Sequence, residues 1–197
     1  MKILFVIIIL VVSVVTMAQV YISKYSSRTE QHKYEVIKSY DKFEIRRYVP
    51  ALFSSVILEK KGYKENSGEG FRILAGYIFG GNESNEKIAM TSPVAMELGD
   101  TSKMMFMVPE SYQLENLPTP NNSKIVFEKK EEKIMAAIQF SGWADDEKIE
   151  KYKLILINEL ENEKLLSNGK FTFLGYNAPF ELTNRRNEVI VELINYK

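Results

Sequence analysis

The chain has 197 residues, of which 45% are apolar and 26% are charged, a composition typical of a folded globular protein. Its 26 Lys and Arg residues balance its 26 Asp and Glu residues, so no net charge favours nucleic acid as a partner. The absence of cysteine and the presence of a single histidine exclude disulfides, thiolate catalysis, cysteine zinc sites and multi-histidine metal sites. One domain with an appendage accounts for this length.

Residues 3–22 form an uncharged, strongly apolar run directly after Lys2. Such a run directs a chain to a membrane, either as a cleaved signal peptide or as a transmembrane anchor. We favour the anchor, because the run lasts for about 20 residues, the length that crosses a bilayer. The sequence therefore predicts residues 1–23 as a signal peptide or anchor, residues 24–33 as a polar tether, and a membrane-anchored or exported protein.

From residue 34 onward the pattern changes to short alternating runs that are typical of strands, interrupted by two stretches with helical spacing. The first helix is indicated by Phe71, Leu74, Ala75 and Ile78, which recur at i, i+3, i+4 and i+7. In the second helix, Asp145 suits the N-cap position. In chain order we expect strands at 34–39, 43–48 and 51–59, a helix at 66–79, strands at 87–98 and 103–109, a loop at 112–123, strands at 125–128 and 133–140, a helix at 145–163, and strands at 171–177 and 188–195.

Each half of this pattern contains two strands, a helix and two more strands, and the two helices start about eighty residues apart. The sequence thus predicts an α+β fold with two pseudo-equivalent halves, in which two helices pack on a curved antiparallel sheet or distorted β-barrel. A cleft between such halves is a common place for a small ligand.

Residues 87–98 alternate between a long apolar face, which includes Met90 and Met96, and a face of small side chains. A proline cannot donate to a strand ladder, so we expect the strand to break at Ser92-Pro93. Flexible thioethers beside a broken strand would suit a flat apolar ligand, but filling the core is the more common use of such residues.

The chain contains none of the phosphate-binding glycine loops or nucleophile elbows that mark common enzyme classes. Acid–base chemistry would require a pair from Glu97, Glu188 and Glu192, although alternating strands more often place such residues on a solvated face. We therefore expect no enzymatic activity.

Two basic features could contact a carboxylate-bearing ligand or an iron atom, although each has a more common explanation. Arg185 and Arg186 would suit propionate groups at the mouth of a pocket, although an exposed loop with a salt bridge to Glu188 is the more common arrangement. His32 is a weak candidate for an axial iron ligand, because its place in the predicted tether favours an exposed side chain instead. We expect no other metal site.

Several segments, taken together and in order, resemble the SOUL family of heme-binding proteins, and the match extends over about residues 34–194. They are Tyr34-Glu35-Val36, Phe43-Glu44-Ile45-Arg46-Arg47-Tyr48, Gly80-Gly81-Asn82, Lys87-Ile88-Ala89-Met90-Thr91-Ser92-Pro93-Val94, Gly175-Tyr176-Asn177-Ala178-Pro179 and Arg185-Arg186-Asn187-Glu188-Val189.

The resemblance implies a SOUL-like domain over residues 34–197, a distorted β-barrel with two helices, and noncovalent binding of heme or another tetrapyrrole in an apolar groove along the first helix. Carried over by position, the groove involves one helical face and a nearby methionine, and Arg72 meets a propionate. The cofactor-binding residues expected are Phe71, Arg72, Ala75, Ile78 and Met90.

Two other functions remain open at this stage. One is a small-molecule hydrolase or sensor on a related two-half fold, which would require a buried glutamate with a raised pKa in the cleft. The other is a ligand-free interaction module at the membrane. The tetrapyrrole-binding module is the expected function, with membrane contact through residues 3–22 and no nucleic-acid partner.

Overall fold

The computed structural model describes residues 2–26, 29–60, 62–99, 101–178, 181–182 and 184–196. Its helices are α1 (Lys2–Ser26), α2 (Tyr63–Ile78) and α3 (Asp146–Asn162), with a short 3-10 helix η1 (Leu114–Asn116). Its strands are β1 (Glu30–Gln31), β2 (Tyr34–Ser39), β3 (Glu44–Tyr48), β4 (Ala51–Leu58), β5 (Thr91–Ser92), β6 (Val94–Glu97), β7 (Ser102–Met107), β8 (Val126–Lys130), β9 (Lys133–Ser141), β10 (Ser167–Gly175) and β11 (Arg186–Leu193).

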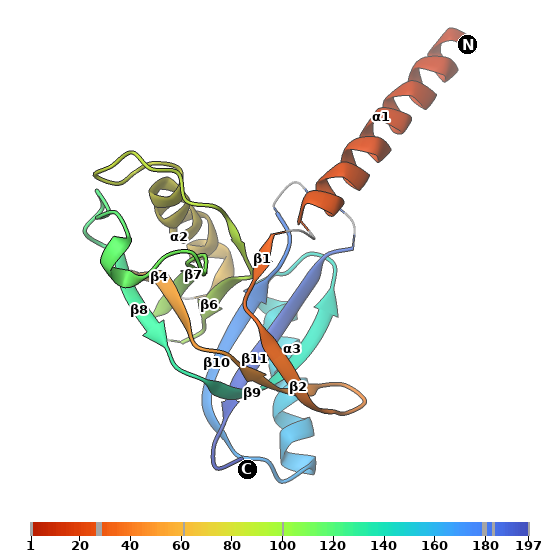
Figure 1. Ribbon diagram of the computed structural model, residues 1–197. Helices are drawn as coiled ribbons and strands as arrows, with labels where there is room; N and C mark the ends of the chain where they lie inside the picture. Colours follow the sequence, from red (N-terminus) through yellow and green to blue (C-terminus); the bar gives the residue numbers. More distant parts are fainter. Residues whose placement is uncertain are drawn as a thin grey trace.

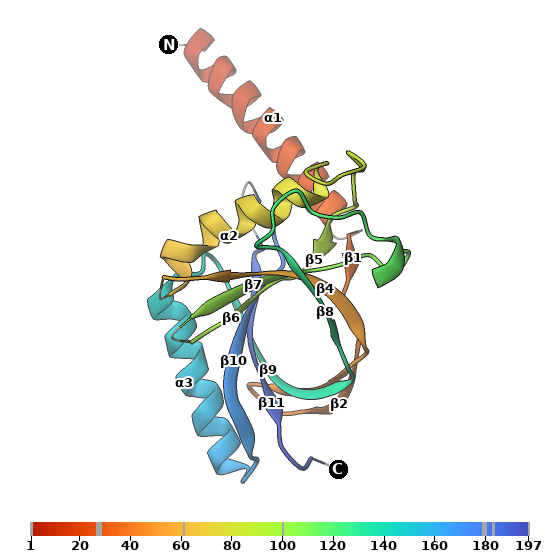
Figure 2. The ribbon, with the colours of Figure 1, turned by 90° about the vertical axis from the view of Figure 1, so that its left-hand side faces the viewer.

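Nine of these strands form one antiparallel sheet in the order β2-β3-β9-β11-β10-β6-β7-β4-β8. The sheet curls into a half-barrel, and α2 and α3 lie on the outside of the curl (Figure 2). The α+β class and the antiparallel sheet are thus confirmed. The predicted barrel is an open half-barrel, because β2 and β8 end the sheet without pairing with each other.

The two halves of the chain repeat the same order of elements, β3-β4-α2-β6-β7 and β8-β9-α3-β10-β11, and β6 and β10 join them at a central seam. Within each half the last three strands pair together, as β4-β7-β6 and as β9-β11-β10. The first strand of each half instead crosses over, so that β3 pairs with β9 and β8 pairs with β4. The halves therefore exchange their first strands.

Alternation along the strands divides the core into two layers. Side chains on the outer face pack beneath the helices, where Leu74 of α2 and Leu156 of α3 are completely buried. Met96 belongs to this layer, so it fills the core, as the more common reading of its pattern predicted. A second, smaller apolar cluster lies on the concave face, around Phe53 and Ile190.

Two adjacent aspartates, Asp145 and Asp146, accept hydrogen bonds from backbone N–H groups at the starts of the two helices. Asp145 caps α3, since its side chain accepts a hydrogen bond of 2.8 Å from the Lys148 N–H. Asp146, in the first turn of α3, instead accepts hydrogen bonds from the Tyr63 and Lys64 N–H groups at the start of α2. The cap predicted at Asp145 is therefore present, and the cap of α2 comes from the other half of the chain.

The strand predicted over residues 87–98 is divided as expected. The peptide bond between Ser92 and Pro93 is cis, and it separates β5 from β6. β5 pairs in parallel with β1, while β6 enters the main sheet.

Helix α1 extends away from the sheet (Figure 1). Most of its described apolar side chains are exposed. Near its end, Gln19 accepts a hydrogen bond of 3.0 Å from the Leu182 N–H. Crossing a bilayer takes about 20 consecutive, mainly apolar helical residues. Within the described ranges, no helix has both the length and the apolar character for this. This finding contradicts the prediction of a membrane-anchored or exported protein. Ser27 and Arg28 of the predicted tether lie outside the described residues.

Candidate functional site

The concave face of the half-barrel holds a cavity of about 400 Å³, within the range of small-molecule sites. Its floor is apolar and is formed by alternate residues of central strands, which turn their other side chains to the helices. The floor residues are Phe53, Ala95, Met105, Leu174 and Ile190, joined by Met135.

Sequence analysis did not single out these floor residues. A signal was nevertheless present, because Met104, Met105, Phe106 and Met107 of β7 form an uninterrupted apolar run. Such a run indicates a strand that is buried on both faces and not on one alone.

One side of the cavity carries a closed square of ion pairs. Lys103 lies 3.3 Å from Glu97 and 3.1 Å from Glu128, and Lys130 lies 3.0 Å and 3.2 Å from the same two carboxylates. Burial favours a raised pKa for the Glu128 carboxyl, but its hydrogen bonds and charge interactions with the two lysines lower it overall. Each charge in the square is thus balanced by its neighbours.

The opposite wall is also paired. Lys133 of β9 forms an ion pair with Glu192 of β11, which accepts a further hydrogen bond of 2.9 Å from the Asn168 amide. At the rim, Glu131 lies 3.5 Å from Lys129. Among the lysines and glutamates that line the cavity, only Lys170 forms no ion pair and no side-chain hydrogen bond with the described residues.

A buried polar network lies beside the floor. The carboxylate of Glu188 is completely buried and accepts hydrogen bonds from Arg46 Nη1 at 2.8 Å, Arg186 Nη2 at 2.7 Å, Arg186 Nε at 3.0 Å and the Tyr176 hydroxyl at 2.8 Å. The arginines also lie over aromatic rings, Arg46 at 4.3 Å from the centre of the Tyr34 ring and Arg186 at 4.0 Å from that of Tyr176. Glu188 is therefore not part of a solvated face, unlike the expectation for strand glutamates.

Contacts within this network determine the protonation states of its arginine and tyrosine side chains. Burial works to lower the pKa of the Arg46 guanidinium, but the hydrogen bond and charge of Glu188 raise it overall. Burial, followed by the charge of Glu188, raises the pKa of Tyr48 to about 12 and also raises the pKa of Tyr176. The tyrosines are therefore neutral at physiological pH, and each Glu188 oxygen already accepts two hydrogen bonds, which leaves the network no free proton acceptor.

The two adjacent arginines have separate roles. Arg186 forms the salt bridge to Glu188 that the common arrangement of such residues predicted, but the carboxylate is buried. Arg185 stacks at 4.0 Å over the exposed Trp143 ring, and its Nη1 donates to the carbonyl oxygens of Ala178 and Glu181. Pro179, which contributed to the family resemblance, lies outside the described residues.

His32 lines one end of the cavity and is partly buried. Its ring lies 4.9 Å from the Tyr48 ring and 5.4 Å from the Phe53 ring, and its Nε2 hydrogen-bonds to the Val49 carbonyl at 2.8 Å. Since a carbonyl only accepts, Nε2 carries the proton. Burial lowers the pKa of the ring, in opposition to this hydrogen bond. The side chain is thus more sheltered than a tether residue would be.

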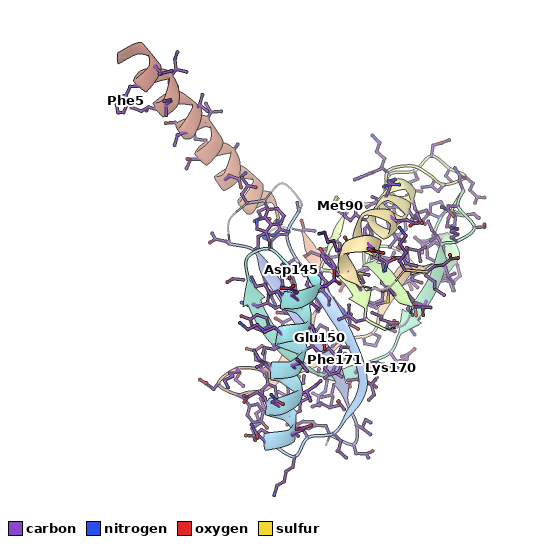
Figure 3. All side chains as sticks on the ribbon, turned by 180° about the vertical axis from the view of Figure 1, so that it is seen from behind. Phe5, Met90, Asp145, Glu150, Lys170 and Phe171 are labelled. Carbon is purple, nitrogen blue, oxygen red and sulfur yellow. The ribbon has the colours of Figure 1, made fainter. Side chains whose placement is uncertain are left out.

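The residues predicted to bind the cofactor lie on or beside α2, on the opposite face of the sheet from the cavity. Ala75 and Ile78 face the sheet and are buried. Phe71 is partly buried, with its ring 5.4 Å from that of Phe106. Arg72 is exposed, and Met90, beside α2, is 42% exposed (Figure 3). The structure thus brings the set together around one helix but divides it between the core and the surface.

The solvent face of α2 is unusually bare. Gly68, Arg72 and Gly76 follow one another at intervals of four residues, and Phe79, just beyond the helix, is 58% exposed. A Cβ atom built on Gly68 or Gly76 would meet no atom within 4 Å, so packing does not require glycine at either position. At Gly70, by contrast, it would lie 2.8 Å from a Leu58 methyl group.

Comparison with solved structures agrees with the fold described above. The EcmrR C-terminal domain superposes with a TM-score of 0.62 at 8% sequence identity, over 83% of this chain and 99% of that one. A hydrolase from Listeria innocua superposes with a TM-score of 0.56 at 9% identity, over 87% and 97% of the two chains. At such identities the likeness concerns the fold alone.

Comparison with known sequences identifies relatives. Heme-binding protein 2 of Mus musculus is 34% identical over 156 residues, which cover 75% of this chain and 76% of that protein. Heme-binding protein 2 of Homo sapiens is 32% identical with the same coverage, and heme-binding protein 1 of Xenopus laevis is 28% identical over 75% and 81%. The family model described as SOUL heme-binding protein matches residues 29–192. The chain therefore belongs to the SOUL heme-binding protein family.

Proposed function

We propose that this protein binds heme or a related tetrapyrrole noncovalently, as a binding module and not as an enzyme, on the outer face of α2. Membership of the SOUL family and relatives named heme-binding protein support the ligand. The bare face of α2 around Arg72 is the observation that carries the location. The absence of a free proton acceptor around Glu188 supports binding over hydrolysis.

The glycines fit the flat shape of the ligand. Glycine inside a helix costs about 0.5–1 kcal/mol relative to alanine, and neither Gly68 nor Gly76 recovers this through packing with the described residues. Without side chains at these positions, a planar ring can approach the helix backbone closely. The glycines therefore make sense as part of a contact surface for a flat molecule.

The side chains around the glycines suit the two parts of a tetrapyrrole. Arg72, between the two glycines, can pair with a propionate through its guanidinium fork. The partly exposed Phe71 and Met90 offer apolar contacts, and methionine sulfur interacts favourably with aromatic faces. Ala75 and Ile78 lie on the buried face of α2 and pack it against the sheet. His32 is not part of this site, because it lines the cavity on the concave face.

The test is a hemin titration of the full chain, followed through the Soret band, with Arg72→Glu, Gly76→Ala and His32→Ala beside the wild type. We expect saturable one-to-one binding that weakens at least tenfold in Arg72→Glu, where a propionate meets a like charge, and survives in His32→Ala. Gly76→Ala should weaken hemin binding while raising the free energy of unfolding by about 0.5–1 kcal/mol, so weaker binding there cannot come from misfolding. Unchanged hemin affinity in both Arg72→Glu and Gly76→Ala would exclude this face.

A further inference from the structure

The concave cavity is a second place where this protein can hold a small molecule, and it lies across the sheet from the proposed tetrapyrrole face. Its floor joins Phe53, Met105, Leu174 and Ile190 into one apolar surface, each no more than 7% exposed. Ion-paired side chains surround this floor, and the sheet curls around it with the helices outside (Figure 2). An apolar floor with a charged rim suits an amphipathic ligand.

The charged residues of the rim indicate whether that ligand is an anion or a cation. The glutamates that line the cavity all have lysine partners, Glu97 with Lys103 and Lys130, Glu192 with Lys133, and Glu131 with Lys129. A cationic ligand would have to displace one of these lysines. An anionic ligand needs no displacement, because Lys170 faces the cavity and forms no ion pair with the described residues.

Strand β10 aims Lys170 at the cavity. Its neighbour Phe171 is buried on the α3 side, with the Lys153 ammonium 5.6 Å from its ring centre (Figure 3). Lys170, Thr172 and Leu174 instead line the concave cavity, and Lys170 does so next to an irregularity in the β10–β11 pairing between Ser167 and Phe171. Lys170 is exposed at the rim, while Leu174 belongs to the buried floor, so a charged group and an apolar surface follow each other along one strand.

We propose that the concave cavity binds an amphipathic monocarboxylate of the fatty-acid class, with its chain on the apolar floor and its carboxylate at Lys170. This site is separate from the proposed tetrapyrrole face, so both ligands can be bound at once. The ligand carries one negative charge because, among the described residues, Lys170 is the one ammonium group of the rim without an ion-pair partner.

The test uses dodecanoate as the probe and isothermal titration calorimetry on the full chain. Dodecyltrimethylammonium, with the same chain and the opposite charge, is the matched control ligand. We expect one dodecanoate per chain, binding about three- to fivefold weaker in Lys170→Gln and more than tenfold weaker in Lys170→Glu. Lys151→Gln, which removes an exposed lysine from α3, should leave the affinity unchanged.

A second variant fills the cavity without changing a charge. Thr172→Phe places an aromatic ring, which strands tolerate well, into the cavity, and should abolish dodecanoate binding while hemin still binds. Dodecanoate binding that survives both Lys170→Glu and Thr172→Phe would be partitioning onto exposed apolar surface such as α1, and would overturn the proposal. Equal or tighter binding of the ammonium probe would overturn the charge assignment.

The two proposed sites can fail separately. Hemin binding in saturating dodecanoate should match hemin binding without it, and Arg72→Glu should leave dodecanoate binding unchanged. If dodecanoate displaces hemin and Lys170→Glu weakens hemin binding, the cavity is the tetrapyrrole site and a separate fatty-acid site is excluded. If hemin does not bind at all while dodecanoate binds as described, the proposed function fails and the cavity proposal stands.

Discussion

Glu188 holds a charge in a place that water does not reach, and its two oxygens accept four hydrogen bonds from two arginines and a tyrosine. A buried ion pair is weak evidence for stability compared with an apolar core, but removing one partner from it is costly. Arg46 lies in β3, Arg186 in β11 and Tyr176 directly after β10, and these strands all belong to one side of the central seam. The network therefore fixes how these strands sit against one another.

Glu188→Gln should lower the free energy of unfolding by about 3–5 kcal/mol, because two guanidinium groups lose the buried charge that compensates them. Urea unfolding followed by circular dichroism measures this. Glu192→Gln is the control, since that side chain is 31% exposed and its ion pair with Lys133 is worth no more than about 1 kcal/mol. Equal losses in the two variants would show that the buried network has no special role.

At the scale of elements, the start of α2 depends on a residue that follows it by more than eighty positions. Gly62, at the N-cap position, supplies no side-chain cap, and Asp146 of α3 accepts from the first two backbone N–H groups instead. A carboxylate is also favourable at this end of a helix because of the helix dipole. The first turn of α3 therefore stabilises both helices at once.

Asp146→Ala should lower the free energy of unfolding by about 1–2 kcal/mol, since two N–H groups lose their acceptor. Hydrogen exchange distinguishes the cause, because the Tyr63 and Lys64 amides should lose protection while those in the middle of α3 keep it. Glu147→Ala, an exposed neighbour in the same turn, is the matched control. Unchanged protection at Tyr63 would contradict the shared cap.

The cap at Asp146 illustrates what local sequence patterns cannot predict. Periodicity predicted α2 within three residues of its true start, and Asp145 was identified as a cap because that bond is local. No local pattern reveals that Asp146 serves a helix in the other half. The same limit applies to the two proposed sites. Arg72 is expected from the family resemblance, whereas Lys170 becomes a candidate only when strands from both halves line one cavity.

At the scale of the whole molecule, the curled sheet separates two surfaces of different chemistry. Its outer side presents α2, with exposed glycines around an arginine, and its inner side presents an apolar floor with a charged rim. Strand alternation could have indicated two apolar layers, but the direction of the curl depends on how all nine strands pair. The two-half arrangement was accessible from the order of elements, and the exchange of first strands was not.

A chain cut in the loop between the halves tests that exchange. We expect fragments 1–116 and 117–197 to lack cooperative unfolding when alone, because each would carry a first strand whose partner lies on the other fragment. Mixed in equal amounts, they should form a one-to-one complex with the circular dichroism of the intact chain. Cooperative unfolding of either fragment alone would contradict this prediction.

The exchange of β3 and β8 also bears on how a chain with two similar halves can change over time. Two repeats that merely sat side by side could be separated, lost or recombined one at a time, because each would keep all its own strands. Here each repeat completes the sheet of its twin, so deletion of one would leave the survivor with an unpaired strand edge and an exposed apolar face. The pair is inherited as a unit, while substitutions within either repeat remain free to make its surface different from that of its twin.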